Sequence, residues 1–357
     1  VKARFCLNEG THYKYHDELE YASEAEKWLQ MAATESDKLI TSGRYEIYNT
    51  GHPQEDYFNM YRIDDKSDLK EAVLYVDYKT NIREHNMAAA GREAGCGFSK
   101  SFVESFLCSD GLPISLSNKY LGDETMRKET ANRDPRLKQL ILTNDFPTNV
   151  TDDLKDSTFV VNEDEFITQH CFTGYRPIKG FNPIYSQALY MKSSFDGIAY
   201  RYAETLLINA EAKAELNTIT NADLDRTVNQ LRDRVGMPHL TVNVGFTDPK
   251  WPDWGYSLSP VLQEIRRERC IELAGEGFRF NDLKRWKAGK LLNNVLTYVG
   301  KRKPDGNLAI VYPNYTNPDL SYQAGKSRTW EDKMYLYPIP TGELQRNPQL
   351  LPQNPGW

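Results

Sequence analysis

Residues 265–286 read IRRERCIELAGEGFRFNDLKRW, and this stretch decides the fold. Directly before it, Ser259 and Pro260 have the order of a helix N-cap and a proline at the first helical position. Apolar residues then recur with helical spacing until the GEG run at residues 275–277, and a second helix is expected over residues 282–292. The stretch therefore predicts two helices packed as a hairpin. The side chains expected on the inner faces are Leu258, Val261, Leu262, Ile265, Leu273, Leu283, Trp286 and Leu291.

The same hairpin carries a high density of charge. Glu268 and Glu272 lie four residues apart, and Arg266, Arg267 and Arg269 stand beside them. Carboxylates and guanidinium groups at this spacing predict an ion-pair network that ties the helices together. A glycosidase needs only two well-placed carboxylates, so that alternative stays open. The sequence contains no GxGxxG, HExxH, GxSxG or CxxC pattern, and an enzyme is not predicted.

Further helices are expected outside this hairpin. Residues 200–216 carry an apolar stripe, and Asn221 is expected to cap a following helix that Gly236 ends. Residues 21–40 carry a similar stripe, and Gly43 stands where a left-handed C-cap belongs. Such helix pairs predict stacking similar to tetratricopeptide repeats, although the strict repeat signature is missing. The residues expected on the buried faces are Leu29, Ala32, Ala33, Ala203, Leu206, Leu207, Ala210, Ala214, Leu224, Val228, Leu231 and Val235.

The remaining segments have little periodicity. Residues 71–78 favour a strand, because Val73, Tyr75 and Val76 suit extended backbone. Residues 110–199 are rich in Asn, Asp, Pro and aromatic side chains and show no sustained pattern. The predicted fold is mainly α, with tetratricopeptide-like helical hairpins, a large irregular loop region and minor β-structure. No low-complexity linker divides the chain, so residues 1–357 are interpreted as one domain.

Composition narrows the possible partners. The net charge is −6 and the basic residues form no block, which argues against nucleic acid and against an anionic membrane surface as partners. No run of 18 apolar residues occurs, so no membrane-spanning helix is expected. The 22 tyrosines favour a binding surface. Five cysteines without CxxC spacing are expected as buried free thiols, namely Cys6, Cys96, Cys108, Cys171 and Cys270.

Neither the histidines nor the acidic residues predict a cofactor. His12 and His16 have the i,i+4 spacing of a metal-binding pair, and a solvated helix end is the alternative interpretation. The acidic clusters offer oxygen ligands of the kind that calcium prefers, but they lack EF-hand spacing and are interpreted as solvated surface. These clusters are Asp64-Asp65, Asp152-Asp153 and Glu163-Asp164-Glu165.

Segments spread over almost the whole chain resemble, in order, the motifs of the SusD/RagB family. Residues 265–286 resemble the family's RERRIEL…EG-x-RF-x-DL-x-RW run, and Cys108 stands where methionine is expected in another segment. Each motif alone is weak, whereas their common order identifies the chain as similar to this family. The other segments are ARFCLNEGT at 3–11, SGRY at 42–45, SFVESFLCSDGLP at 101–113, NRDPRL at 132–137, YRYAETLLINAEA at 200–212, YLYPIP at 335–340, Asn347-Pro348 and NPGW at 354–357.

The resemblance implies a SusD-like fold with four tetratricopeptide-like units and a large irregular region. It implies an outward-facing lipoprotein of the bacterial outer membrane that captures oligosaccharides, or in some members peptides, for a SusC-like TonB-dependent transporter. The chain is then expected to be the C-terminal portion, with the anchoring cysteine and the first helical units upstream of Val1. The motif residues themselves are interpreted as structural, so the function rests on family analogy.

Aromatic side chains in irregular segments are the candidate ligand contacts, because sugar rings stack on aromatic faces. Trp251 and Trp254 lie in a loop with two prolines and form a possible platform, with attachment of the loop to the body as the alternative. Tyr120 and Phe146 flank the NRDPRL segment, with core packing as the alternative. The function expected first is glycan capture. Peptide or glycopeptide capture, a carbohydrate-active enzyme and a protein-binding adaptor are the alternatives.

Overall fold

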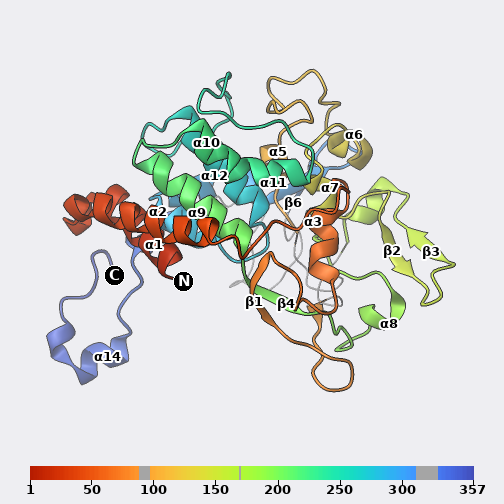
Figure 1. Cartoon of the computed structure of the whole chain (residues 1–357), viewed down its shortest axis with the longest axis horizontal. Helices are drawn as coiled ribbons and strands as arrows, with labels where there is room; N and C mark the ends of the chain where they lie inside the picture. Colours follow the sequence, from red (N-terminus) through yellow and green to blue (C-terminus); the bar gives the residue numbers. More distant parts are fainter. Residues whose placement is uncertain (88–96, 169, 311–328) are drawn as a thin grey trace.

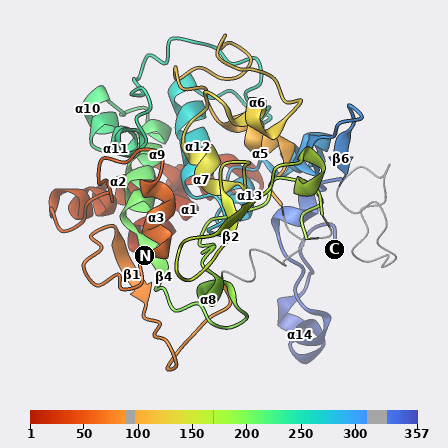
Figure 2. The same ribbon diagram turned by 90° about the vertical axis from the view of Figure 1, so that its right-hand side faces the viewer.

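The computed structural model describes residues 1–87, 97–168, 170–310 and 329–357. The long helices gather on one side of the molecule, and the short elements of the irregular region lie on the other side (Figure 1). The C-terminal helix α14 stands apart from the helical body in both views (Figure 1, Figure 2). The helices of the body are α1 (Lys2–Tyr15), α2 (Ala25–Thr41), α9 (Tyr202–Glu215), α10 (Asn221–Asp225), α11 (Val228–Arg234), α12 (Pro260–Glu272) and α13 (Arg279–Arg285), and α14 spans Thr341–Arg346.

The predicted hairpin of residues 258–292 is confirmed as α12 and α13, with one change of bounds. Ser259 caps α12 by accepting a hydrogen bond from the backbone N–H of Leu262, and Pro260 opens the helix. The second helix was expected over residues 282–292, but α13 begins at Arg279 and ends at Arg285. It ends there because Lys287 adopts a left-handed backbone with φ of 50°, and a 3-10 helix follows over Gly289–Asn293.

The second predicted hairpin is also present, but it differs from the prediction at two points. Thr220, not Asn221, is the N-cap, because its hydroxyl accepts from the N–H of Asp223 while Asp223 accepts from Thr220 in return. The expected single helix is divided into α10 and α11, since Thr227 leaves the helical region. Helix α2 buries Leu29, Ala32 and Ala33 as predicted. The faces of α9 to α12 meet in a core that includes Leu206, Leu207, Leu224, Leu231 and Ile265, and the buried residues of α2 belong to a separate cluster.

Three small sheets of two strands each accompany the described helices. The predicted strand at residues 71–78 is β1 (Ala72–Val76), which pairs antiparallel with β4 (Gly197–Arg201). The register brings Ala72 opposite Arg201 and Tyr75 opposite Ile198, and β4 continues directly into α9. The other pairs are β2 (Pro147–Val150) with β3 (Ser157–Phe159) and β5 (Val299–Arg302) with β6 (Leu308–Ile310).

The irregular region has a core of its own, around Tyr57, Phe106 and Tyr175. Its elements are each only a few residues long, so no periodicity accumulates in the sequence. The result is the mainly helical fold with minor β-structure that the sequence predicts. The helices of this region are α3 (Asp56–Asn59), α5 (Lys100–Ser105), α6 (Met126–Thr130), α7 (Arg136–Leu140) and α8 (Tyr185–Ala188).

Two further predictions concern the burial of the cysteines and the absence of a membrane-spanning helix. Cys6 and Cys108 are buried free thiols, Cys171 is buried, Cys270 is free but only partly buried, and Cys96 lies outside the described residues. Within the described ranges, no helix combines the length and the apolar character needed to cross a membrane.

The predicted ion-pair network exists, but its arginines come mainly from other elements. The Glu272 carboxylate is fully buried and accepts hydrogen bonds from Arg201 on β4 at 2.6 Å, Arg234 on α11 at 2.6 Å and Arg136 on α7 at 3.0 Å. Burial raises the pKa of Glu272, but Arg234, Arg201 and Arg136 outweigh this effect and hold the pKa well below its ordinary value. Arg266, Arg267 and Arg269 of α12 pair with Glu215, Asp248 and Asp282.

We expect Glu272→Gln to lower the free energy of unfolding by roughly 3 kcal/mol, because it leaves three buried guanidinium groups without their common anion. Since the folded state depresses this pKa, the stabilisation is complete above the ordinary value of 4.5 and is lost as the pH falls below it. The difference between the native chain and the variant should therefore shrink in acid. Urea denaturation of both proteins at pH values above and below 4.5 measures this difference in stability.

Glu343→Gln is the matched control, because Glu343 pairs with Arg346 at the exposed surface of α14. We expect it to change stability by less than about 0.5 kcal/mol. An equal effect of the two substitutions at neutral pH would contradict the central role of Glu272.

Candidate functional site

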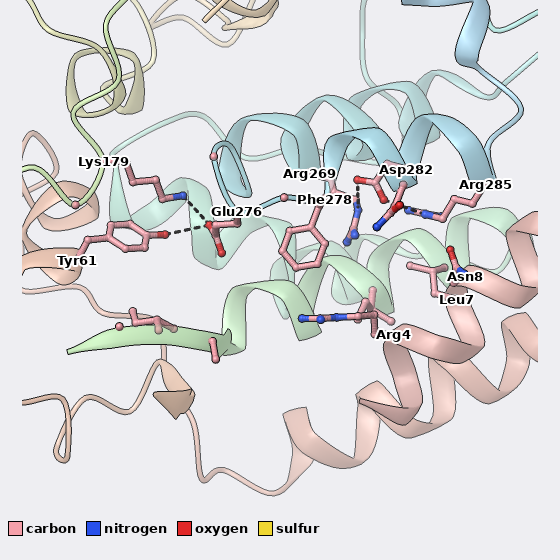
Figure 3. Close-up of a pocket in the computed structure, with 18 of the residues that line it drawn as sticks. Arg4, Leu7, Asn8, Tyr61, Lys179, Arg269, Glu276, Phe278, Asp282 and Arg285 are labelled. Atoms are coloured by element: carbon pink, nitrogen blue, oxygen red, sulfur yellow. Dashed lines mark hydrogen bonds and ion pairs between the residues drawn. The ribbon is translucent and has the colours of Figure 1, made fainter. Parts of the chain in front are cut away.

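A cavity of about 1130 Å³ lies between helix α1, strand β4, the turn from α12 to α13 and the C-terminal segment. Figure 3 shows that its wall combines aromatic rings with charged side chains from several elements. Arg4, Leu7 and Asn8 come from α1, and Phe278 comes from the turn before α13. The cavity therefore joins residues that are more than 270 positions apart in the chain.

One end of the cavity holds a buried cation. Lys179 donates hydrogen bonds to Glu276 at 2.6 Å, to the carbonyl oxygen of Ala274 at 2.7 Å and to the hydroxyl of Tyr57 at 2.9 Å. Burial lowers the pKa of Lys179 to about 8, although Glu276 opposes this effect. Burial also raises the pKa of Glu276, but Arg201 and Lys179 outweigh it and lower that pKa to about 2. Glu276 is thus a firmly ionised carboxylate, which also accepts from the hydroxyl of Tyr61.

The middle of the cavity is formed by an aromatic ring between two guanidinium groups. The Cζ atom of Arg4 lies 4.9 Å from the ring centre of Phe278, and that of Arg269 lies 5.3 Å from it (Figure 3). Arg4 also pairs with Glu204 on α9 and lies 4.1 Å from the ring of Tyr200. Both distances are within the range of a cation–π interaction, so the two arginines restrain the Phe278 ring.

At the other end, Asp282 accepts a hydrogen bond from Nε of Arg269 and one from Nε of Arg285, both at 2.9 Å. Burial raises the pKa of Asp282, but Arg269 and Arg285 outweigh it and the pKa is lowered. A general acid needs a raised pKa and a free proton, whereas Asp282 and Glu276 in the cavity wall have lowered pKa values and are paired with cations. Burial does raise the pKa of Glu129, which lies inside the core and not in the cavity wall.

The structure places the two predicted tryptophans against α12. Trp254 is only 6% exposed, donates from Nε1 to Gln263 at 2.6 Å and meets Trp286 edge to face. Trp251 is partly buried and donates from Nε1 to Glu264 at 2.7 Å. Both indoles thus attach their loop to the helix. Neither lines the cavity, and a ligand contact by Trp251 or Trp254 stays a prediction.

The other two predicted residues also lie outside the cavity wall. The ring of Phe146 packs edge to face against Phe58 at 5.2 Å, beside the core of the irregular region. Tyr120 is partly buried, and the Cζ atom of Arg133 lies 5.3 Å from its ring centre. Tyr120, Phe146 and the two tryptophans do not form one surface around this cavity. Contact of Tyr120 or Phe146 with a ligand stays a prediction.

The sequence does not indicate the cavity residues as a site. Arg4, Glu276 and Asp282 belong to quoted motifs, but they were interpreted as structural. Lys179 and Tyr61 belong to segments without any motif. The EGF run at residues 276–278 is the one available signal, because it places an aromatic residue next to a glycine turn that brings backbone and side chains close together.

The residues considered for metal binding are engaged with other groups. The rings of His12 and His16 stack at 4.1 Å, while the nitrogens of His16 contact Glu18 at 2.9 Å and the carbonyl oxygen of Lys284 at 2.8 Å. Asp152 accepts from the backbone of Ser186. Across the part of the chain that the structure describes, no cluster of three or more His, Cys, Asp or Glu side chains is arranged to hold a metal ion.

The fold is a helical-hairpin scaffold around a cavity that combines ring faces, fixed hydrogen-bond donors and paired carboxylates, which is the kind of concave site in which small ligands bind. A family model described as the SusD family matches residues 35–357, and the chain belongs to this family.

Individual relatives agree with this assignment. A SusD-like protein P2 from Formosa agariphila is 33% identical over 166 residues, which are 46% of this chain and 27% of the relative. The crystal structure of a SusD-like protein from Bacteroides fragilis is 25% identical with a TM-score of 0.66, and the match covers 93% of this chain. A SusD-like carbohydrate binding protein from the same species is 22% identical with a TM-score of 0.64 over 98% of this chain. The chain spans 64% and 63% of the length of these two structures.

We expect the ammonium group of Lys179 to titrate near pH 8. Because Glu276 raises this pKa against the effect of burial, Glu276→Gln should lower it further. Reductive methylation with ¹³C followed by NMR measures the titration directly. Glu343→Gln, at the surface of α14, should leave it unchanged. Titration of Lys179 near the ordinary value of 10.5 would show that the cation is not buried as described.

Proposed function

We propose that this protein captures an oligosaccharide at the bacterial surface and passes it to a TonB-dependent SusC-like transporter in the outer membrane. The observation that carries the proposal is the cavity beside Phe278, in a chain that belongs to the SusD family. Sugar rings present apolar faces that pack on aromatic rings and hydroxyl groups that need hydrogen-bond partners. The cavity offers both kinds of contact.

The individual contacts support a sugar as the ligand. Phe278 and Tyr61 contribute aromatic surface to the wall, and Asn8 and Asn281 contribute amide groups that both donate and accept. Two arginines lie within cation–π distance of Phe278, so its ring is ordered before a ligand arrives. Such preorganisation lowers the entropy that binding costs. One relative described as a carbohydrate binding protein has the same fold, which favours a sugar over a peptide.

The proposed role is binding without chemical change. Glu276 and Asp282, two carboxylates of the cavity wall, are paired with cations and have lowered pKa values. Neither carries the proton that an acid catalyst of glycoside cleavage must donate. A capture protein releases its ligand intact, and the transporter is the partner that receives it.

The proposed location is the outward face of the outer membrane. There the protein would be held by a lipid on a cysteine upstream of this chain, as the family resemblance implies. A short tether of this kind keeps a capture protein close to its transporter and raises the effective concentration of one for the other.

We expect the full-length protein to bind one class of oligosaccharide saturably in calorimetric titration, with the sugar recovered at unchanged mass. Phe278→Ala should weaken this binding by about fivefold, which corresponds to about 1 kcal/mol for the loss of one ring contact. Tyr185→Ala is the control, because Tyr185 is 51% exposed and lies outside the cavity wall. Tyr185→Ala should leave the affinity unchanged.

Three results would count against the proposal. Recovery of a shortened sugar would make the protein an enzyme. Binding of peptides without binding of any sugar would assign it to peptide capture. Equal loss of affinity in Phe278→Ala and Tyr185→Ala would place the sugar outside this cavity.

A further inference from the structure

The cavity wall continues onto the protein surface along the C-terminal segment. Tyr335 belongs to the wall and is only 4% exposed, and its hydroxyl accepts a hydrogen bond from the backbone N–H of Gly289 at 2.8 Å. The next residue, Leu336, has an extended backbone with φ of −111° and ψ of 135°. Side chains two positions apart on an extended backbone point to the same side. Tyr337 therefore points to the same side of the segment as Tyr335, but it lies at the surface and is 70% exposed.

The ring of Tyr337 is both open to solvent and restrained. Nζ of Lys284 lies 3.8 Å from the ring centre. An atom this close to the centre lies over the ring face, because in the plane of the ring it would overlap the ring carbons. The ammonium group thus restrains the ring through a cation–π interaction on one face, and the large exposed fraction of Tyr337 leaves the other face accessible.

A second exposed ring lies near the same ammonium group. Phe280 and Lys284 are four residues apart in α13, so they lie on one face of this helix. Phe280 is 46% exposed, and its ring centre lies 5.9 Å from Nζ of Lys284. The opposite edge of contact is fixed, since Phe280 meets Trp330 at a ring-centre distance of 6.1 Å. We call Phe280, Lys284 and Tyr337 the outer platform.

Lys284 connects the outer platform with the cavity, because it belongs to the cavity wall. Burial lowers the pKa of Lys284, and no carboxylate of the described residues forms an ion pair with its ammonium group. The backbone at this position is fixed, since the carbonyl oxygen of Lys284 lies 2.8 Å from Nε2 of His16. An ammonium group without a carboxylate partner can donate hydrogen bonds to sugar hydroxyls. The outer platform therefore combines two accessible rings with a hydrogen-bond donor close to both.

We propose that the binding site extends from the cavity onto the outer platform, and that its ligand is an oligosaccharide long enough to occupy both. One end of the sugar chain lies in the cavity beside Phe278. The units that follow pack on Phe280 and Tyr337, and Lys284 donates hydrogen bonds to their hydroxyls. The inference rests on the proposed function and adds to it the length of the captured sugar and the residues that select for length.

The test is calorimetric titration of the full-length protein with size ladders, from disaccharide to hexasaccharide, of malto-, xylo-, laminari- and chito-oligosaccharides. In a ladder that binds, we expect the hexasaccharide to bind about tenfold more tightly than the disaccharide, because only the longer chain gains ring contacts on the outer platform.

Substitutions connect this length dependence to the outer platform. Tyr337→Ala should weaken the hexasaccharide about fivefold and leave the disaccharide unchanged, because the shorter sugar does not reach this ring. Phe280→Ala should act in the same way, whereas Phe278→Ala should weaken both sugars. Tyr337→Phe keeps the ring and its contact with Lys284, so it should retain the native affinity.

Tyr190→Ala is the matched control. Tyr190 is 73% exposed, which is similar to Tyr337, and it follows α8 outside the cavity wall. We expect this variant to bind every member of the ladder with native affinity.

The outcomes separate this inference from the proposed function. If the disaccharide and the hexasaccharide bind equally tightly, or if Tyr337→Ala leaves the hexasaccharide unchanged, the inference is wrong and glycan capture stands. An equal loss in Tyr190→Ala, or an equal loss for the disaccharide in Tyr337→Ala, would also contradict the outer platform. An equal loss in Tyr337→Phe and Tyr337→Ala would exclude packing on the ring. If no ladder binds, the inference is wrong together with the proposed function.

Discussion

The structure depends on one buried carboxylate. Glu272 collects arginines from α7, β4 and α11 at a single point, and it thereby joins the helical body to the irregular region. Removing four charged groups from water is expensive, and the cost is offset only because every arginine has a fixed place and a short hydrogen bond. These ion pairs restrain the segments around Glu272, although each of them is short.

The ion pairs around Glu272 continue into the cavity wall. Arg201 binds Glu272 and also Glu276, and Glu276 in turn holds Lys179. The turn that carries Phe278 therefore begins at a residue already fixed by the core. A binding site is precise when its wall is supported by such a second layer of contacts, and here the support is electrostatic.

The sequence predicts the helical hairpins because their signals are local: a serine and a proline begin α12, and glycines follow its end. It misses the cap at Thr220, since Asn221 is an equally good capping residue by type and only the reciprocal bond with Asp223 decides between them. It also misses the cavity, because Arg4 and Phe278 meet only in the folded chain. For Trp254, the sequence contains no sign that Gln263 accepts its N–H and Trp286 covers its ring.

The buried free cysteines affect the lifetime of the folded protein. Burial raises the pKa of Cys6 and of Cys108, so these thiols stay protonated and are poor nucleophiles while the fold is closed. An opened chain exposes several thiols at once, and in an oxidising medium these thiols form disulfides that trap the open chain. Because disulfide formation is slow compared with the reassembly of helices, the lifetime of the protein in such a medium follows the equilibrium population of the opened chain.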